Sequence, residues 1–330
     1  MSRLRHGFGA QGLLASWLAS PPPDAAVEIA ADRVAAAVVA SRGGAARVQA
    51  YAVEALPAGT VAPALTAHNI LDRAAVAAAV RAALARLGSR PTRVALVIPD
   101  VAAKVSVLRF EHVPARRDDL DQLVRWQIRK STPFPIEDAC VSYAPGRRAP
   151  DGTEFVVVVA RRDVVSEYED ACRDAGAYAG LVELATFSVL NLTLAAAAPA
   201  AGDWLVVHMR PEYTSIAIVR DGDLIFFRNR PEGDEETLAD VVHQTSMYYQ
   251  DRLAGQGFAR VLLGGAGRAA GTVAQARRDL EERLAAPVEA IDLTAVAALP
   301  DRIGAPPDLV DVLGPLTGVL LRAQREAVSA

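Results

Sequence analysis

The stretch 118–143 constrains the fold most, because its residues fix a helix, a rigid corner and a strand in immediate succession. Acidic residues open the helical pattern, as the N-terminus of a helix favours, and apolar residues then recur on one face. The sequence reads Pro-Phe-Pro at 133–135, and a proline disfavours a helical conformation in the residue before it. The helix therefore ends at Ser131 or Thr132, and a strand is predicted over 139–143.

Composition and charge limit the classes of protein to which this chain can belong. A chain of 330 residues can bury a large core, and we expect it to form two lobes. Its formal net charge of −4 and its pI near 5.8 offer no basic footprint for nucleic acid. No run of about 18 apolar residues could span a bilayer. Cys140 and Cys172 lack the spacing of a zinc site or a disulfide framework, so a reducing cytosol is the expected compartment.

The N-terminal 20 residues lack the long apolar region and cleavage site of a signal peptide. They carry a few basic residues and then an apolar run that includes Trp17, and the prolines at 21–23 end this leader. Two interpretations are open. The leader is a weakly ordered terminus, or it is a helix that lies on a membrane surface with Trp17 at the interface.

The remaining sequence alternates between strand and helix patterns, which is typical of an α/β fold. An amphipathic helix is predicted over 73–87, and a continuous apolar strand over 93–98. Asp221-Gly222 predicts a tight hairpin turn. The other predicted elements are strands over 25–40, 47–53, 105–110, 155–160, 181–184, 204–209, 213–220, 223–228 and 260–263, and helices over 163–175, 187–198, 237–253, 280–284 and 310–322, the last with a break at Gly314-Pro315.

The whole run 118–143 resembles a segment of the PilM family, the actin-like components of type IV pilus assembly. In that family a helix bearing Arg-Trp runs into a Pro-Phe-Pro-Ile corner, acidic residues and a strand that ends in tyrosine. The corresponding residues here are Arg125-Trp126, Pro133-Phe134-Pro135-Ile136, Glu137-Asp138 and Tyr143. Weaker matches to the same family follow in the same order along the chain, and they extend the resemblance from about residue 23 to 325.

The resemblance implies an α/β, actin-like (ribonuclease H-like, duplicated) fold of two lobes with a small inserted α+β subdomain. Residues 1–22 would form the leader, and 23–200 the first lobe, which carries the insert at about 101–182. Residues 201–330 would form the second lobe, whose C-terminal helix returns to the first. In the insert we expect two helices over a small sheet, with a polar loop over 144–152 and with Asp163 as the N-cap of the second helix.

Actin-like ATPases hold phosphate with a glycine-containing hairpin, where small residues let backbone amides approach the oxygens. In PilM-like sequences the first hairpin reads Asp-Ile-Gly, then Ser/Thr residues and a Lys. Here the run from Glu28 to Arg33 reads EIAADR, and Ala35 stands where the Lys would fall. The glycine, the hydroxyls and the lysine are absent, and Asp32 would bring a negative charge close to the phosphates. We interpret this hairpin as structural.

The second phosphate hairpin of the family is also altered. His208 stands in place of the aspartate and Arg210 in place of the glycine, while Pro211 removes an amide donor. A lone histidine beside an apolar strand is more often packed than catalytic, and we predict no catalytic or metal-binding residues. Gly264, Gly265 and Gly267 form a strand-to-helix turn that resembles a remnant of the adenosine site, although such turns often need glycine for other reasons.

The resemblance implies a scaffold rather than an enzyme, with no bound cofactor and with Mg-ATP disfavoured. The implied partner is the cytoplasmic N-terminal tail of a PilN-like membrane protein, with pilus motor ATPases as further partners, no nucleic acid, and a location at the cytoplasmic face of the inner membrane. We expect Trp126, Pro133, Phe134 and Pro135 to belong to the partner-binding region; the alternative is that they only form a stiff, packed turn.

Two alternatives stay open on sequence grounds. One is an ATP-binding or ATP-hydrolysing enzyme of the same fold, although such chemistry needs carboxylates for magnesium and amides around the phosphates. The other is the cytoplasmic L-like component of a type II secretion system.

Overall fold

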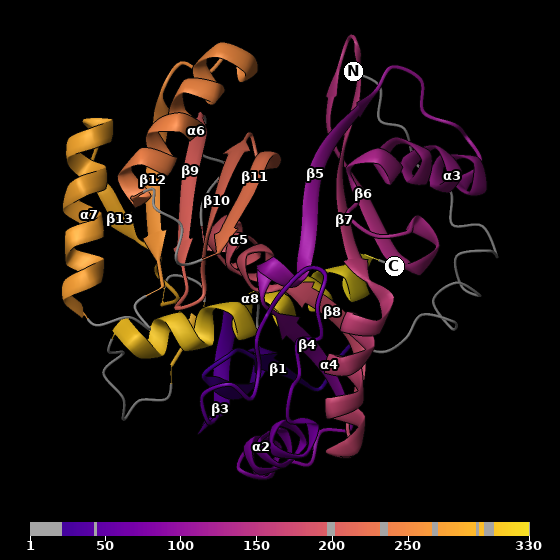
Figure 1. Cartoon of the computed structure of the whole chain (residues 1–330). Coiled ribbons are helices and arrows are strands. Elements are labelled where there is room, and N and C mark those ends of the chain that lie inside the picture. The colour runs from indigo at the N-terminus through magenta and orange to yellow at the C-terminus, as the bar shows by residue number, and fades with distance from the viewer. Residues whose placement is uncertain are drawn as a thin grey trace.

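The computed structural model describes residues 22–42, 45–196, 202–231, 237–265, 270–294, 297–299 and 307–329. The predicted leader and Gly267 lie outside these residues. The strands of the described part form three sheets. Figure 1 shows the two larger sheets in separate halves of the molecule, with helices α5 (Ala185–Ala196) and α8 (Pro307–Ser329) between them. No helix of the described residues is both long enough and apolar enough to cross a membrane.

The first sheet is mixed, because its central strand pairs antiparallel with one neighbour and parallel with the other. Its six strands are, in order, β14 (Ala297–Ala298), β3 (Ala45–Ala55), β2 (Arg33–Arg42), β1 (Ala25–Ile29), β4 (Arg93–Ile98) and β8 (Tyr178–Leu184). Successive side chains of a strand face opposite sides of the sheet, so β1 contributes Val27 and Ile29 to one core and Ala26 to the other.

Helices α2 (Arg73–Ala85) and α4 (Arg162–Asp174) cover one face of this sheet. The carboxylate of Asp72 caps α2 by accepting a hydrogen bond from the backbone amide of Ala75 at 3.0 Å. The prediction of Asp163 as the N-cap of α4 is wrong. The cap position belongs to Arg161, and Asp163 lies in the first turn, where its carboxylate binds the Arg161 guanidinium.

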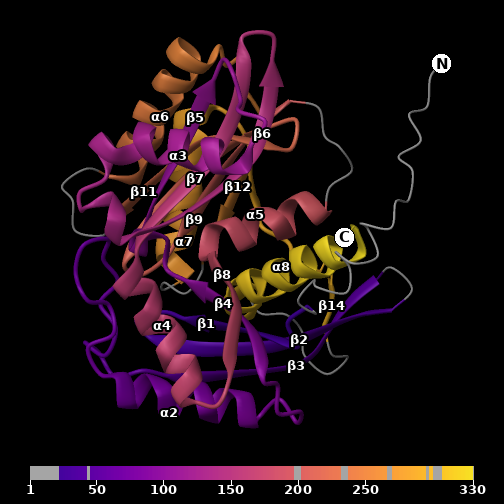
Figure 2. The same ribbon diagram turned by 90° about the vertical axis from the view of Figure 1, so that its right-hand side faces the viewer.

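Helix α8 lies across the other face of the first sheet and packs against α5, as Figure 2 shows. A Cβ on Gly318 would lie 1.8 Å from the carbonyl oxygen of Ser188, so the two helices cross with their backbones in contact. The break predicted at Pro315 is absent, and α8 continues through it. Four side chains of α8 are almost fully buried, and together they outweigh the roughly 3 kcal/mol that an interior proline costs. They are Leu313, Leu316, Val319 and Leu320.

The second sheet has five strands: β11 (Asp223–Pro231), β10 (Tyr213–Arg220), β9 (Asp203–Met209), β12 (Phe258–Gly264) and β13 (Val288–Ala290). Helices α6 (Leu238–Leu253) and α7 (Ala270–Leu284) cover one face. The other face packs against Phe187, Leu190 and Leu194 of α5. Because Leu192 of the same helix packs into the first sheet, α5 is buried between the two halves and joins their cores.

The third sheet has three strands, β5 (Ala103–Phe110), β7 (Gly152–Arg161) and β6 (Ala139–Ala149), and helix α3 (Arg117–Ile128) covers one of its faces. The loop predicted over 144–152 is wrong in its extent. Strand β6 continues to Ala149, with a register shift between Pro145 and Arg148, and pairs with β7 along most of its length. The residues at the end of this edge strand are polar and lie at the surface, so their sequence pattern resembles that of a loop.

The elements on either side of this sheet belong to the first sheet and its core. Strand β8, which we placed partly in the insert, pairs in parallel with β4. The second of the two predicted insert helices, α4, buries Val164, Tyr168, Ala171 and Cys172 in the core of the first sheet. The inserted sheet thus carries one helix, α3, on its face.

Candidate functional site

The two hairpins that correspond to the phosphate-binding hairpins of actin-like ATPases have the same backbone closure. In the first, the amide of Ala30 donates to the carbonyl of Arg33 at 2.9 Å; in the second, the amide of Arg210 donates to the carbonyl of Tyr213 at 2.7 Å. Each hairpin joins two antiparallel strands of its own sheet. The two hairpins therefore have equivalent backbones, and their side chains determine what can bind there.

Those side chains form an ion pair across the two halves of the molecule. Arg210 donates to Glu28 at 2.8 Å, and Arg33 approaches the other carboxylate oxygen at 3.4 Å. Glu28 and Arg210 are 1% and 4% exposed, so their charges are removed from water. Burial opposes the charge of Arg210, but the Glu28 carboxylate raises its pKa above the ordinary value. A cation of the protein thus lies between the hairpins.

A second buried network lies beside this ion pair. The Asp100 carboxylate accepts hydrogen bonds from the Ser215 hydroxyl at 2.5 Å, the Thr186 amide at 3.0 Å and the Thr186 hydroxyl. The Thr186 hydroxyl also lies 2.7 Å from Nδ1 of His208. Burial raises the pKa of Asp100, and burial together with Arg210 lowers the pKa of His208 far below its ordinary value. The His208 ring is therefore enclosed, and its surroundings favour the neutral form.

The glycine turn after β12 packs directly against the second hairpin. A Cβ on Gly265, whose φ is +104°, would lie 1.7 Å from the carbonyl oxygen of Met209. A Cβ on Gly264 would lie 2.7 Å from Ile291. Gly265 therefore requires glycine for packing alone, whereas at Gly264 the end of the flexible Ile291 side chain could shift to admit a Cβ; the assignment of either glycine to an adenosine site stays a prediction. Among the described residues, no group of three or more His, Cys, Asp or Glu side chains is placed to hold a metal ion.

A groove of about 560 Å³ opens on the side of the inserted sheet that α3 leaves uncovered. Its floor is apolar and includes Val156 and Val158 of β7 and Phe187, Leu190 and Leu194 of α5. At its margin, Arg322 of α8 donates to Glu183 of β8 at 2.6 Å. Elements of all three sheets meet along this groove, so no single sequence segment could reveal it.

Strand β6 forms one wall of the groove and is an edge strand. Within the described residues, no strand pairs with its outer edge. Val141 and Tyr143 pack toward α3, whereas Ser142 and Ala144 lie opposite Val158 and Val156 on the groove side. The strand thus combines an unpaired backbone edge with two differently lined faces, which is the arrangement that accepts an added strand.

The structure places the predicted partner-binding residues on the α3 side of the inserted sheet. Phe134 is half-buried and packs with α3 in the core of this sheet, while Pro133 and Pro135 are exposed. Trp126 is 70% exposed and lies outside the residues that line the groove. The role of these four residues in partner binding stays a prediction.

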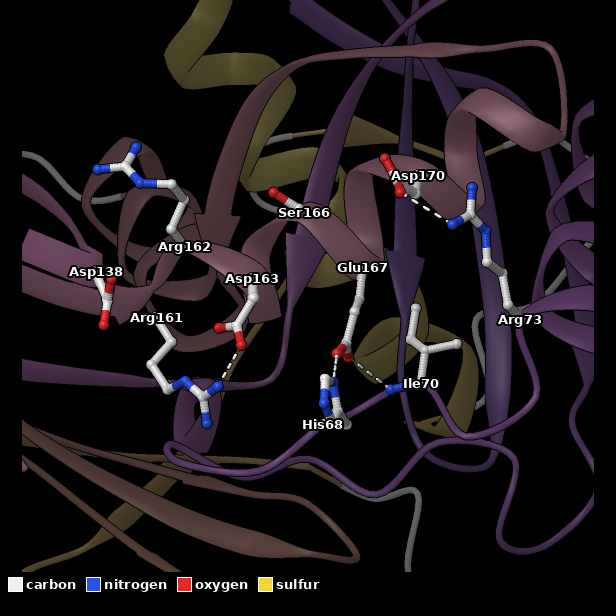
Figure 3. Close-up of a pocket in the computed structure, with 10 residues that line it drawn as sticks. All are labelled: His68, Ile70, Arg73, Asp138, Arg161, Arg162, Asp163, Ser166, Glu167 and Asp170. Carbon is white, nitrogen blue, oxygen red and sulfur yellow. Dashed lines mark hydrogen bonds and ion pairs between the residues drawn. The ribbon is translucent and has the colours of Figure 1, made fainter. Parts of the chain in front are cut away.

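A second, polar pocket of about 640 Å³ lies between α4 and the loop that precedes α2. Figure 3 shows His68 and Ile70 converging on Glu167, and Arg73 reaching Asp170. The Glu167 carboxylate accepts from the His68 ring and from the backbone amides of Asn69 at 2.7 Å and Ile70 at 3.0 Å. These hydrogen bonds fix the loop that precedes α2 to helix α4.

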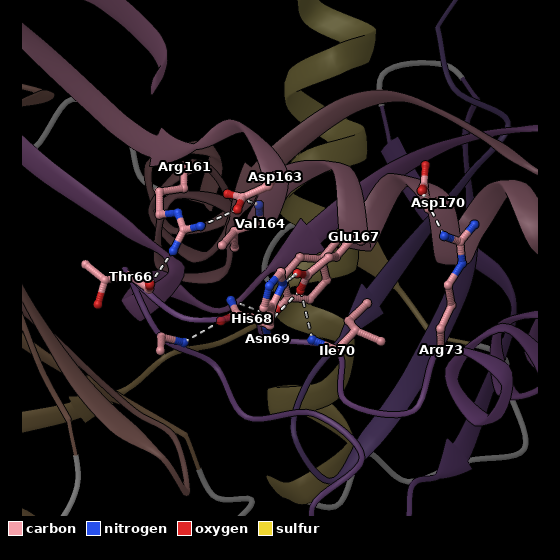
Figure 4. A network of polar contacts seen from close by, with 12 residues as sticks. Thr66, His68, Asn69, Ile70, Arg73, Arg161, Asp163, Val164, Glu167 and Asp170 are labelled. Carbon is pink, nitrogen blue, oxygen red and sulfur yellow. Dashed lines mark hydrogen bonds and ion pairs between the residues drawn. The ribbon is translucent and has the colours of Figure 1, made fainter. Parts of the chain in front are cut away.

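The arginines of this pocket are also engaged within the protein. Figure 4 shows Arg161 between the carbonyl of Thr66 and the carboxylate of Asp163. Arg162 donates to the carbonyl of Ala139, the first residue of β6, at 3.1 Å. The pocket thus holds paired charges of both signs, and its contacts fix the base of β6, and with it one wall of the groove, to the first sheet.

Comparisons with solved structures agree with this architecture. A structure described as the PilM–PilN type IV pilus biogenesis complex matches with a TM-score of 0.77 and 17% identity, over 94% of this chain and 99% of that chain. A protein with an actin-like ATPase fold from Bacteroides thetaiotaomicron matches at 0.49 with 10% identity, over 90% and 96% of the two chains. The cytoplasmic domain of EpsL, an inner-membrane component of the Vibrio cholerae type II secretion system, matches at 0.47 with 11% identity, over 90% and 94%.

The match to the PilM–PilN complex, over nearly the whole chain, confirms the predicted actin-like fold. The model of the family described as type IV pilus assembly protein PilM matches residues 26–254, well over half of the chain. The match includes both hairpins and the whole inserted sheet. This chain belongs to the PilM family of type IV pilus assembly proteins.

Proposed function

We propose that this protein is a non-catalytic scaffold of a type IV pilus assembly platform, and that it holds the extended cytoplasmic tail of a PilN-like membrane protein in the groove beside β6. The observation that carries the proposal is the apolar groove bounded by the unpaired edge of β6. The complex of a PilM with a PilN among the matching structures supports a partner of this kind. The protein would then lie at the cytoplasmic face of the inner membrane, attached through its partner.

Strand addition explains how the groove would select a tail. A tail that pairs with β6 gains main-chain hydrogen bonds, and its alternate side chains point to opposite faces of the sheet. Those on the groove side would meet Val156, Val158 and Leu194. Those on the other side would meet the polar pocket between β6 and the start of α3, where Arg117, Asp118 and Asp121 lie. The preferred tail therefore alternates apolar residues with polar ones.

The closed hairpins support the absence of ATP hydrolysis. In an actin-like ATPase, amides and a metal-bound carboxylate face the phosphates. Here the Glu28 carboxylate is engaged by Arg210 and Arg33 in a buried ion pair. A phosphate would have to displace that pair and would meet the exposed carboxylate of Asp32. We expect isothermal titration with Mg-ATP to give no heat of binding; micromolar binding with turnover would refute the non-catalytic role.

A labelled peptide with the sequence of the PilN-like tail tests the groove. We expect saturable binding by fluorescence polarisation, and a loss of at least tenfold in affinity for Ala144→Arg, which places a long cation on the groove side of β6. Arg148→Ala changes the same strand beyond the lining residues and is the matched control. A peptide that does not bind the folded protein, or that binds Ala144→Arg as tightly as the native chain, would refute the proposed site.

A further inference from the structure

Trp126 is 70% exposed, which is the largest exposed fraction among the large apolar side chains of the described residues. It lies near the C-terminal end of α3, on the face turned away from the core of the inserted sheet. Neither the groove nor the hairpins use it. This indole has no packing role among the described residues, so its value must be sought in the side chains beside it.

Three cations lie at the same end of α3 as this indole. Arg129 and Lys130 follow it by three and four residues, in the 3₁₀ turn Arg129–Ser131 that continues α3. Both are exposed, and neither forms an ion pair in the described structure. The ammonium of Lys104, from β5, reaches the same end of the helix and donates to the carbonyl of Ser131. We call the set Lys104, Trp126, Arg129 and Lys130 the α3 tip.

The α3 tip lacks nearby acids in the sequence. No acidic residue occurs between Asp121, which is already paired with Arg125 at 2.8 Å, and the exposed pair Glu137-Asp138. Cations at a helix C-terminus are favoured by the helix dipole, which explains Arg129 and Lys130 in part. The dipole does not account for Lys104, which comes from another element, or for the exposed tryptophan.

The chemistry of the α3 tip matches a layer of anionic lipid headgroups better than a protein surface. A stable protein interface needs an apolar centre and about 1,000 Å² or more of buried area, and lysine is depleted there. The exposed side of α3 offers a single large apolar side chain among polar neighbours. A tryptophan at headgroup depth, flanked by lysine and arginine, is the arrangement found at membrane surfaces.

We propose that the α3 tip contacts anionic phospholipid headgroups, with the Trp126 indole inserted at the interface and Lys104, Arg129 and Lys130 against the phosphates. So few charges give only weak binding by themselves. The contact rests on the proposed function in one respect, since a partner tail held in the groove would keep the protein close to the bilayer and raise its effective concentration there.

Flotation of the full-length protein with vesicles tests this proposal without the partner. We compare vesicles of phosphatidylglycerol and phosphatidylethanolamine with vesicles of phosphatidylcholine, at low and at high salt. We expect a bound fraction on the anionic vesicles that falls with salt and falls at least threefold for Trp126→Ala and for the double variant Arg129→Gln/Lys130→Gln. Tyr178→Ala removes an aromatic side chain of similar exposure (68%) from the first sheet and is the matched control.

Three results would overturn the proposal: no binding of the native protein to anionic vesicles, unchanged binding of both α3-tip variants, or an equal loss for Tyr178→Ala. The comparison on the full-length chain also separates the α3 tip from the leader, because these substitutions leave residues 1–20 intact. Tail-peptide binding, measured on the same variants, should be unchanged. If the native protein bound vesicles but not the tail peptide, the groove proposal would be refuted and the α3-tip proposal would stand. If Trp126→Ala lost both vesicle binding and peptide binding, Trp126 would belong to the tail site instead.

Discussion

The contact between the Glu28 and Arg210 hairpins, called the cleft below, and the groove beside β6 differ in what fills them. In the cleft, Arg210 of one half meets Glu28 of the other, and both side chains are buried. In the groove, apolar side chains such as Leu194 and Val158 line open space next to an unpaired strand edge. A buried ion pair thus fills the space between the hairpins, whereas the groove beside β6 stays open. Substitutions in the cleft should therefore change stability, and substitutions in the groove should change binding.

The largest expected effect is that of Arg210→Ala. It leaves the Glu28 carboxylate buried with only the longer contact to Arg33, and an uncompensated buried charge costs about 3–5 kcal/mol. Urea unfolding followed by circular dichroism measures this loss. The double variant Glu28→Gln/Arg210→Met removes both charges and should recover much of it. A loss below about 1 kcal/mol for Arg210→Ala would show that the ion pair does not hold the cleft closed.

Glu167→Ala is expected to have the next largest effect. It leaves the amides of Asn69 and Ile70 without their acceptor, and unsatisfied buried groups cost about 1–3 kcal/mol. Asn69 is fully buried, so water cannot replace the carboxylate there. The same unfolding assay measures the loss, with Glu169→Ala, a half-buried glutamate on the same helix, as a control for helix propensity. Equal stability of the two variants would contradict a clamp between the loop and α4.

The pH dependence of stability tests the enclosure of His208. Its pKa is lowered in the folded protein, so below the unfolded-state value of about 6.5 the unfolded chain binds a proton that the folded chain does not. The stability contributed by the neutral ring is therefore present above pH 6.5 and is lost as pH falls, by up to about 1.4 kcal/mol per pH unit. His208→Asn should remove this dependence between pH 6.5 and 5.5. Identical slopes for variant and native protein would show that the ring titrates normally.

The sequence made the hairpins, the inserted corner and most strands predictable, because each depends on local spacing. The pairing of Glu28 with Arg210 was not predictable, since the two residues are 182 positions apart and meet only when the two sheets face each other. The groove is equally non-local, because β6, β7, β8 and α5 each supply part of it. Pro315 shows the limit of local rules, since buried contacts along α8 preserve a helix that the proline alone would interrupt.

The smallest expected effect on stability is that of Ala144→Arg, and this makes it the sharpest test of the comparison. Ala144 is exposed on an edge strand, so we expect its replacement to change the free energy of unfolding by less than about 0.5 kcal/mol. The same change should abolish most tail-peptide binding, because the arginine would occupy the groove side of β6. Urea unfolding and peptide titration on one preparation measure both quantities. If Ala144→Arg unfolded the protein as Arg210→Ala is expected to do, the groove would be part of the structural core, and the distinction between a closed cleft and an open groove would fail.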